Sequence, residues 1–134
     1  MSDNGKPIGA AVVVGGGIAG MEAALDLADQ GFKVHLIEKD LSIGGVMAQL
    51  DKTFPTNDCS TCMLSPKLIE VATNPNIVIH SMADLEAVEG QPGRFKVRIR
   101  KRSRGVDLDK CTGCGICVSV CPVICQPQKR AGGN

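Results

Sequence analysis

The chain has 134 residues, of which 43% are hydrophobic and 22% charged, a balance typical of one globular domain and not of a disordered chain. The net charge is +1, and three Phe with no Trp or Tyr give no base-stacking platform, so the composition predicts no nucleic-acid partner. The apolar stretch over residues 8–28 is interrupted by glycines and acids, so we expect no signal peptide, no membrane span and a cytoplasmic protein.

The first part of the chain predicts a βαβ unit. The valine-rich run from Ile8 to Val14 predicts a fully buried strand of a parallel sheet. Apolar residues then recur at helical spacing from Ile18 to Ala28, and Gly31 is expected to end this helix. A second strand covers residues 34–37 and is followed by Glu38.

The middle of the chain is less regular. Residues 40–66 predict a long loop with a short helix near residues 46–50. Ser65-Pro66 predicts the start of a helix over residues 67–73, because Pro favours the first helical turn. A buried strand is expected at residues 77–79.

A β-hairpin is predicted next, with strands at residues 85–89 and 95–100 around a longer loop at residues 90–93. The seven basic residues between Arg94 and Arg104 are interpreted as a solvated hairpin face. His35 and His80 fall in strand patterns and are interpreted as structural residues.

A glycine motif, G-x-G-x-x-G, lies between the first strand and the helix. Gly15 permits a tight turn, Gly17 lets a pyrophosphate approach the backbone, and Gly20 lets the helix pack closely on the strand. The phosphates would lie at the positive end of the helix. Glu38 is placed to accept hydrogen bonds from a ribose. The motif in this context predicts a dinucleotide site.

FAD and NAD(P) share the ADP moiety that such a motif binds. Lys39, beside the ribose position, is expected to line the adenosine site, and Gly44-Gly45 resembles the glycine doublet of flavoproteins of the glutathione reductase type. The hairpin after the first βαβ unit also resembles that group. These features favour FAD, with NAD(P) in a dehydrogenase as the alternative.

The strongest motif is the cysteine run C-x-x-C-x-x-C-x-x-x-C-P, formed by Cys111, Cys114, Cys117 and Cys121. This spacing is typical of [4Fe–4S] ligation, whereas structural zinc usually needs two separated pairs. The glycines between these cysteines are expected to let the backbone turn around the cluster. The motif predicts one cluster.

Cys59 and Cys62 form a second C-x-x-C pair, which could help to hold a second cluster, act as a redox dithiol or be inert. No clear helix N-terminus is predicted beside this pair. Two cubanes need eight thiolates and the chain has seven cysteines, of which Cys125 is the weakest candidate.

Three segments together resemble the HdrA-like family, the flavin- and iron–sulfur-containing component of heterodisulfide reductase. They are Val12–Ala24, Gly44–Cys62 and Asp109–Pro122, and the resemblance covers residues 10–123. It implies an incomplete, thioredoxin-reductase-like FAD domain over residues 10–104 and a ferredoxin-like [4Fe–4S] segment over residues 105–125. Residues 1–9 would form a tail and the start of the first strand, and residues 126–134 a disordered tail.

The resemblance also implies an oxidoreductase subunit that relays electrons between FAD and [4Fe–4S] clusters. Its partners would be other subunits of a heterodisulfide-reductase-type complex and redox donors such as hydrogenase or ferredoxin. By carry-over, the flavin positions are those of the glycine motif, Glu38 and Gly44-Gly45, and the cluster positions are those of the two cysteine motifs. Family members continue for hundreds of residues, so two alternatives stay open: a fragment of an NAD(P)-linked iron–sulfur reductase, or a non-catalytic fragment that binds a cluster.

Overall fold

The computed structural model describes residues 9–107 and 109–123. These residues belong to two compact units, one ending at Ser103 and one beginning at Arg104, and each is described by itself. Cys125 and the tail expected at residues 126–134 lie outside the described residues.

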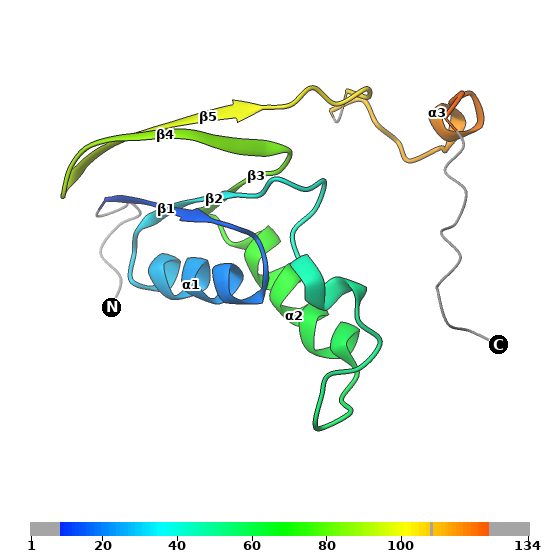
Figure 1. The fold of residues 1–134 in the computed structure, drawn as a ribbon, viewed down its shortest axis with the longest axis horizontal. Coiled ribbons are helices and arrows are strands. Elements are labelled where there is room, and N and C mark those ends of the chain that lie inside the picture. Colours follow the sequence, from blue (N-terminus) through cyan, green and yellow to red (C-terminus); the bar gives the residue numbers. More distant parts are fainter. Residues whose placement is uncertain (1–8, 108, 124–134) are drawn as a thin grey trace. The chain divides into compact units, whose positions relative to one another are not determined.

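The first unit is built on a parallel sheet in the order β1-β2-β3, formed by Ala10–Val14, Lys33–Ile37 and Ile77–His80. The helices are α1 (Ile18–Asp29), the 3₁₀ helix η1 (Gly45–Gln49) and α2 (Ser60–Thr73). The antiparallel hairpin consists of β4 (Ala83–Gln91) and β5 (Arg94–Lys101). Helices α1 and α2 lie on one face of the sheet and the hairpin lies on the other (Figure 1). The predicted βαβ unit, third strand and hairpin are all present.

The hydrophobic core lies between the sheet and the two helices. Val34 and Leu36 of β2 pack there against Met21 of α1 and Val71 of α2, and all four side chains are fully buried. Alternate residues of β2 point to this face because side chains alternate along a strand.

Replacing Leu36 with Ala is expected to lower the free energy of unfolding by about 2–5 kcal/mol, since it removes a buried side chain and leaves a cavity. Denaturation in urea measures this loss. Val88→Ala, at a side chain that is 54% exposed on the hairpin, is the control, with an expected change within about 0.5 kcal/mol. Equal losses in both variants would contradict this placement of the core.

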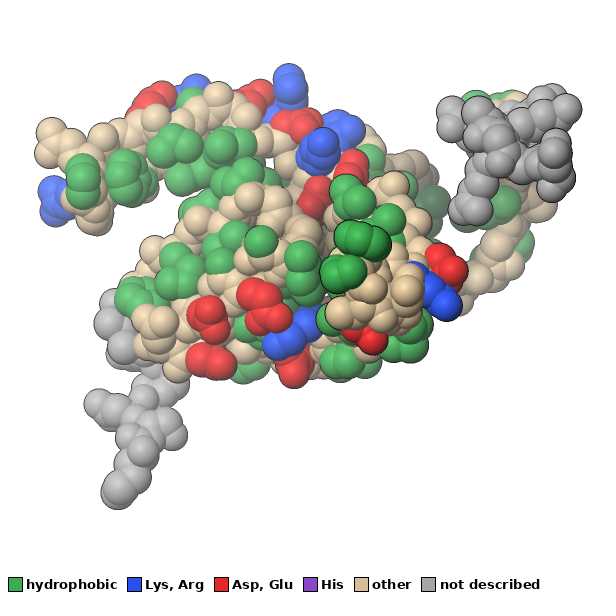
Figure 2. All heavy atoms as spheres, turned by 60° about the horizontal axis from the view of Figure 1, so that its bottom comes forward, with side chains coloured by type: hydrophobic (Ala, Val, Ile, Leu, Met, Phe, Trp, Pro, Cys, Tyr) green, Lys and Arg blue, Asp and Glu red, His purple; other side chains and the backbone are tan. Residues whose placement is uncertain are grey.

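Strand β1 is not fully buried, contrary to the sequence prediction. It is an edge strand, and its residues Val12 and Val14 are 41% and 58% exposed. Hydrophobic side chains on the sheet side of the hairpin, among them Leu85 and Phe95, line a cleft of about 600 Å³ together with β1 (Figure 2). An apolar pattern reports what a strand can bury, and among the described residues no second neighbour covers β1.

Helix α2 begins at Ser60, well before the predicted start at Ser65-Pro66. Pro66 lies inside the helix, where it removes one backbone donor. The earlier start is stabilised by Ser60, whose buried hydroxyl donates to the carbonyls of Leu50 and Asp51, and by packing of Leu64 in the core. These tertiary contacts override the local preference of Pro for a first turn. The short helix predicted near residues 46–50 is present as η1.

The hairpin turn is tighter than predicted. Gln91 pairs with Arg94, so the loop holds two residues, Pro92 and Gly93, in place of the longer loop expected over residues 90–93. Gly93 has a φ of 85°, a left-handed conformation that glycine adopts without a steric penalty. The pairing therefore extends further along both strands than the glycines suggested.

Candidate functional site

The glycine turn between β1 and α1 leaves the start of the helix open to a ligand. Gly15 has a φ of 102°, and its N–H donates to the carbonyl of Ile37 over 2.8 Å, which ties the turn to β2. Gly17 is the N-cap of α1 and has no side chain with which to cap the helix. The N–H groups of the first turn have no acceptors within a helix, and they carry the positive end of its dipole. This is the arrangement that binds phosphate groups.

The second and third glycines of the motif differ in what a side chain would meet. A Cβ atom on Gly20 would lie 1.8 Å from the carbonyl oxygen of Gly15, so the helix can pack on the turn only if this residue is glycine. A Cβ atom on Gly17 would meet nothing within 4 Å. Folding does not require glycine at position 17, and the open space there is what a pyrophosphate needs.

Glu38 follows β2 and directs its carboxylate at the glycine turn. The side chain is buried, its Oε2 accepts from the N–H of Gly16 over 2.6 Å, and its Oε1 accepts from the N–H of Asp40 over 2.9 Å. Each oxygen of a carboxylate can accept a second hydrogen bond. Glu38 is therefore held in place by backbone donors and keeps acceptor capacity for hydroxyl groups.

The glycine doublet packs against the same turn. The N–H of Gly44 donates to the carbonyl of Gly16 over 2.7 Å, and a Cβ atom on Gly45 would lie 3.0 Å from the Cα of Gly17. The residues between β2 and α2 thus fold back over the start of α1.

Two clefts in the first unit bring all seven predicted nucleotide-site residues together. The carboxylate cleft, of about 560 Å³, is lined by Gly15, Glu38, Lys39 and Gly45 among others. The glycine cleft, of about 420 Å³, is lined by Gly15, Gly17, Gly20 and Gly44 among others. Because Gly15 belongs to both, a ligand that lies on the glycine turn reaches the carboxylate.

The carboxylate cleft also contains residues that sequence reasoning missed. Asp40, Gln49 and Asp84 line it beside Glu38 and Lys39. Asp40 and Gln49 lie close to the motif residues and could have been included on that ground. Asp84 comes from the hairpin, and no local pattern indicates that β4 begins next to the end of β2.

Cys59 and Cys62 are joined by a disulfide at the start of α2. Cys59 is the N-cap of this 14-residue helix, and its sulfur accepts from the N–H of Cys62 over 3.2 Å. The expectation that no helix N-terminus lies beside the pair was wrong, because α2 starts earlier than Pro66 suggested. Sulfurs bonded to each other cannot ligate iron, so a cluster role for this pair stays a prediction for its reduced form.

The cysteine run lies in the second unit, around the short helix α3 (Ile116–Ser119). Gly113 and Gly115 have φ values of 70° and 78°, so the backbone turns between the cysteines as the sequence predicted. A hydrogen bond from the backbone of Ile116, with a further one from Thr112, lowers the pKa of the Cys114 thiol, which favours the thiolate that metals bind.

The four cysteines of the run are exposed, and within the described residues no three His, Cys, Asp or Glu side chains gather as a metal-binding group. Four thiols at this spacing nevertheless fit a [4Fe–4S] cluster by their chemistry. The ligand set itself therefore stays a prediction from the sequence.

His35 and His80 lie on neighbouring strands and contact each other. Nδ1 of His35 and Nε2 of His80 are 3.0 Å apart, and the two rings are stacked. Burial, together with the neighbouring His35 and Lys101, lowers the pKa of His80. The pair fits the structural role expected from the strand pattern.

A βαβ unit with a phosphate-ready helix start and an acidic residue after its second strand defines a dinucleotide-binding protein. The family model described as FAD dependent oxidoreductase matches residues 11–110, and the model described as 4Fe-4S binding domain matches residues 105–123. The chain belongs to the FAD dependent oxidoreductase family. FAD and a [4Fe–4S] cluster are the cofactors that these two matches support.

Relatives and one solved structure extend this assignment. The chain is 58% identical to an HdrA-type iron-sulfur subunit of the CoB–CoM heterodisulfide reductase of Methanopyrus kandleri over 84% of this chain and 17% of that protein. It is 55% identical, with the same coverage, to the HdrA-type subunit of the H(2):CoB-CoM heterodisulfide,ferredoxin reductase of Methanothermobacter thermautotrophicus. The fold resembles that of T. acidophilum thioredoxin reductase, with a TM-score of 0.56, 22% identity, and coverage of 66% of this chain and 29% of that one.

The chain therefore spans about one sixth of the length of the relatives it matches. Its thioredoxin-reductase-like fold is confirmed at the level of architecture. None of the helices in the part of the chain that the structure describes has the length and apolar character needed to cross a membrane.

Proposed function

We propose that residues 10–104 bind the ADP moiety of FAD and that residues 105–125 hold a [4Fe–4S] cluster, so that this chain is part of an electron relay. The observation that carries the proposal is the carboxylate of Glu38, held 2.6 Å from the N–H of Gly16 in the glycine turn. This contact puts a ribose acceptor and a phosphate site at one ligand-sized distance.

Each site residue has a role in this proposal. The open first turn of α1 binds the pyrophosphate, Glu38 accepts from the ribose hydroxyls, and Lys39 lines the adenosine end. Cys111, Cys114, Cys117 and Cys121 hold the cluster, and Cys59 with Cys62, once reduced, are candidates for a second one. When bound, FAD supplies two-electron chemistry and a cluster carries single electrons.

For the longer protein we propose a role in a heterodisulfide-reductase-type complex. Support comes from the names of relatives, one of which belongs to an H(2):CoB-CoM heterodisulfide,ferredoxin reductase. The partners of this chain would then be the other subunits of such a complex and a redox donor such as hydrogenase or ferredoxin. The reaction would be reduction of a disulfide.

A weaker version of the function is favoured by strand β1. Its outer edge has no strand partner among the described residues, and Val12 and Val14 on it are exposed. We propose that a further strand of a longer protein pairs with this edge. The chain alone would then bind the ADP moiety but contact the isoalloxazine ring weakly, so ADP and FAD would bind it with similar affinity.

The proposed flavin site is tested with Glu38→Gln. We expect this variant to bind FAD roughly tenfold to a hundredfold more weakly in a calorimetric titration, because a hydrogen bond to a charged acceptor contributes about 1.5–3 kcal/mol. Gln keeps the size of the side chain, and thermal melting shows whether the variant folds.

Glu86→Gln is the matched control, because Glu86 lies on the hairpin, pairs with Arg100 and does not line the carboxylate cleft. It should bind FAD like the wild-type chain. Unchanged FAD affinity in Glu38→Gln, or tighter binding of NADH than of FAD by the wild-type chain, would contradict the proposed site.

A further inference from the structure

The base of the hairpin is attached to the loop that carries Glu38. Three consecutive carbonyl groups, those of residues 38, 39 and 40, each accept a hydrogen bond from this base. The N–H groups of Ala83 and Met82 donate to the first and third over 2.9 and 3.0 Å. The middle carbonyl, that of Lys39, accepts from the guanidinium of Arg102. This middle bond is the only one of the three made by a side chain.

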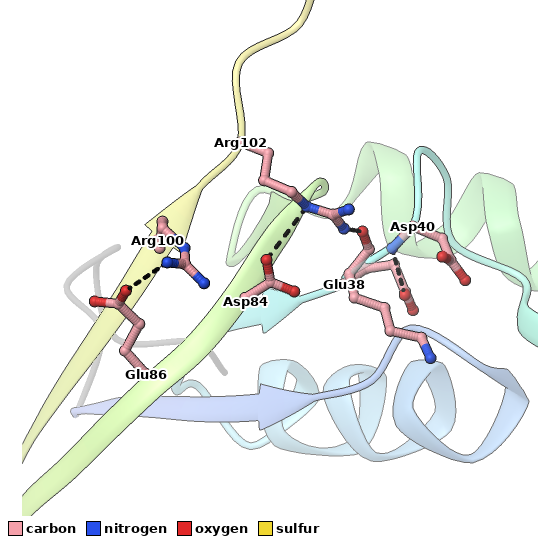
Figure 3. A network of polar contacts seen from close by, with 7 residues as sticks. Glu38, Asp40, Asp84, Glu86, Arg100 and Arg102 are labelled. Atoms are coloured by element: carbon pink, nitrogen blue, oxygen red, sulfur yellow. Dashed lines mark hydrogen bonds and ion pairs between the residues drawn. The ribbon is translucent and has the colours of Figure 1, made fainter.

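Arg102 differs from the other arginines of β5 in what it contacts. Arg98 and Arg100 pair with Glu89 and Glu86 across the hairpin. Arg102 pairs with Asp84 over 3.2 Å through Nε, and its Nη2 reaches beyond the hairpin to the carbonyl of Lys39 (Figure 3). Its own N–H donates to the carbonyl of Met82 over 2.7 Å, which fixes where the side chain starts. The planar guanidinium can hold both partners at once.

Both partners of Arg102 belong to the wall of the carboxylate cleft. Lys39 and Asp84 line this cleft with Glu38 and Asp40. The position of the Glu38 carboxylate depends on the same loop, because its Oε1 accepts from the N–H of Asp40. A change in the path of residues 38–40 therefore moves an oxygen that would meet the ribose.

We propose that Arg102 is a positioning residue for the nucleotide site. By holding the Lys39 carbonyl and Asp84 together, it fixes the loop after β2, so that Glu38 accepts from the ribose hydroxyls in a set geometry. This inference rests on the proposed function, since it takes the carboxylate cleft as the site of the ADP ribose. It separates Arg102 from the remaining basic residues of the hairpin, which form a solvated face.

The alternative is that Arg102 is an ordinary surface residue. Its side chain is 47% exposed, and exposed ion pairs often contribute little to stability. A stability measurement therefore cannot decide between the two roles. Discrimination between two ribose groups can, because it reports only on the contact between Glu38 and the ligand.

The experiment compares ADP with 2′-deoxy-ADP in calorimetric titrations of the whole chain. The wild-type chain should bind ADP roughly tenfold more tightly, since one hydroxyl is lost in the deoxy compound. In Arg102→Gln this preference should fall to about twofold or less. Arg100→Gln is the matched control: it also removes a hairpin ion pair and should keep the full preference.

Arg102→Lys keeps the charge but cannot hold both partners with one planar group, so its preference should be intermediate. It also serves if Arg102→Gln does not fold. A full tenfold preference in a folded Arg102 variant would overturn the positioning role while leaving the proposed function intact. A wild-type chain that binds neither nucleotide would contradict the proposed function and this role with it, and a wild-type chain without ribose preference would contradict this role alone.

Discussion

Gly17→Ala is expected to abolish most FAD binding while leaving the folded chain intact. A Cβ atom at this position meets nothing within 4 Å, and the φ of −73° is accessible to alanine. The added methyl group would instead occupy the space that the pyrophosphate needs beside the first turn of α1. Overpacking of this kind costs about 1–3 kcal/mol, which corresponds to roughly a tenfold to hundredfold weaker Kd.

Gly20→Val is the contrasting variant, because its Cβ would lie 1.8 Å from the Gly15 carbonyl. It should lower the melting temperature as well as the FAD affinity, whereas Gly17→Ala should change the affinity alone. Thermal melting and a calorimetric titration with FAD measure both properties. Gly17→Ala with wild-type affinity would show that no phosphate approaches the turn.

Cys114→Ser is expected to remove the [4Fe–4S] cluster from the chain. Serine offers a poor iron ligand in place of a thiolate, and the pKa of Cys114 is lowered by its hydrogen bonds, as suits a ligand. Iron and sulfide analysis after anaerobic reconstitution should fall from about four of each per chain to near zero, since one cubane holds four of each.

Two further variants define the ligand set. Cys125→Ser should keep the full iron content, because Cys125 falls outside the four-cysteine spacing. Cys59→Ser should leave the first cluster unchanged and lower the iron content only if the reduced pair helps to hold a second cluster. Full iron content in Cys114→Ser would contradict the assignment of the cysteine run.

The nucleotide site could be predicted from sequence because its residues are close together along the chain. Gly15, Gly17 and Gly20 lie within one turn and one helix start, and Glu38 follows the adjacent strand. The structure brings these residues, Lys39 and the glycine doublet to two clefts that share Gly15. Local geometry of this kind is encoded by the motif itself.

Features that depend on tertiary contacts were missed or placed wrongly. The apolar pattern of β1 predicted a buried strand but could not indicate which neighbours this chain supplies. Pro66 marked a helix start by its local preference, yet burial of Ser60 and Leu64 moves the start of α2 to Ser60. Arg102 was grouped with a solvated basic face, since its contact with Lys39 is 63 residues away in sequence.

The most direct test of the flavin and iron–sulfur assignment is the visible absorption spectrum of the anaerobically purified and reconstituted chain, recorded with added FAD after removal of the unbound cofactor. The account predicts an iron–sulfur shoulder that dithionite bleaches, together with flavin bands that the Gly17→Ala variant lacks. A chain that retains neither flavin nor iron–sulfur absorbance would contradict the account.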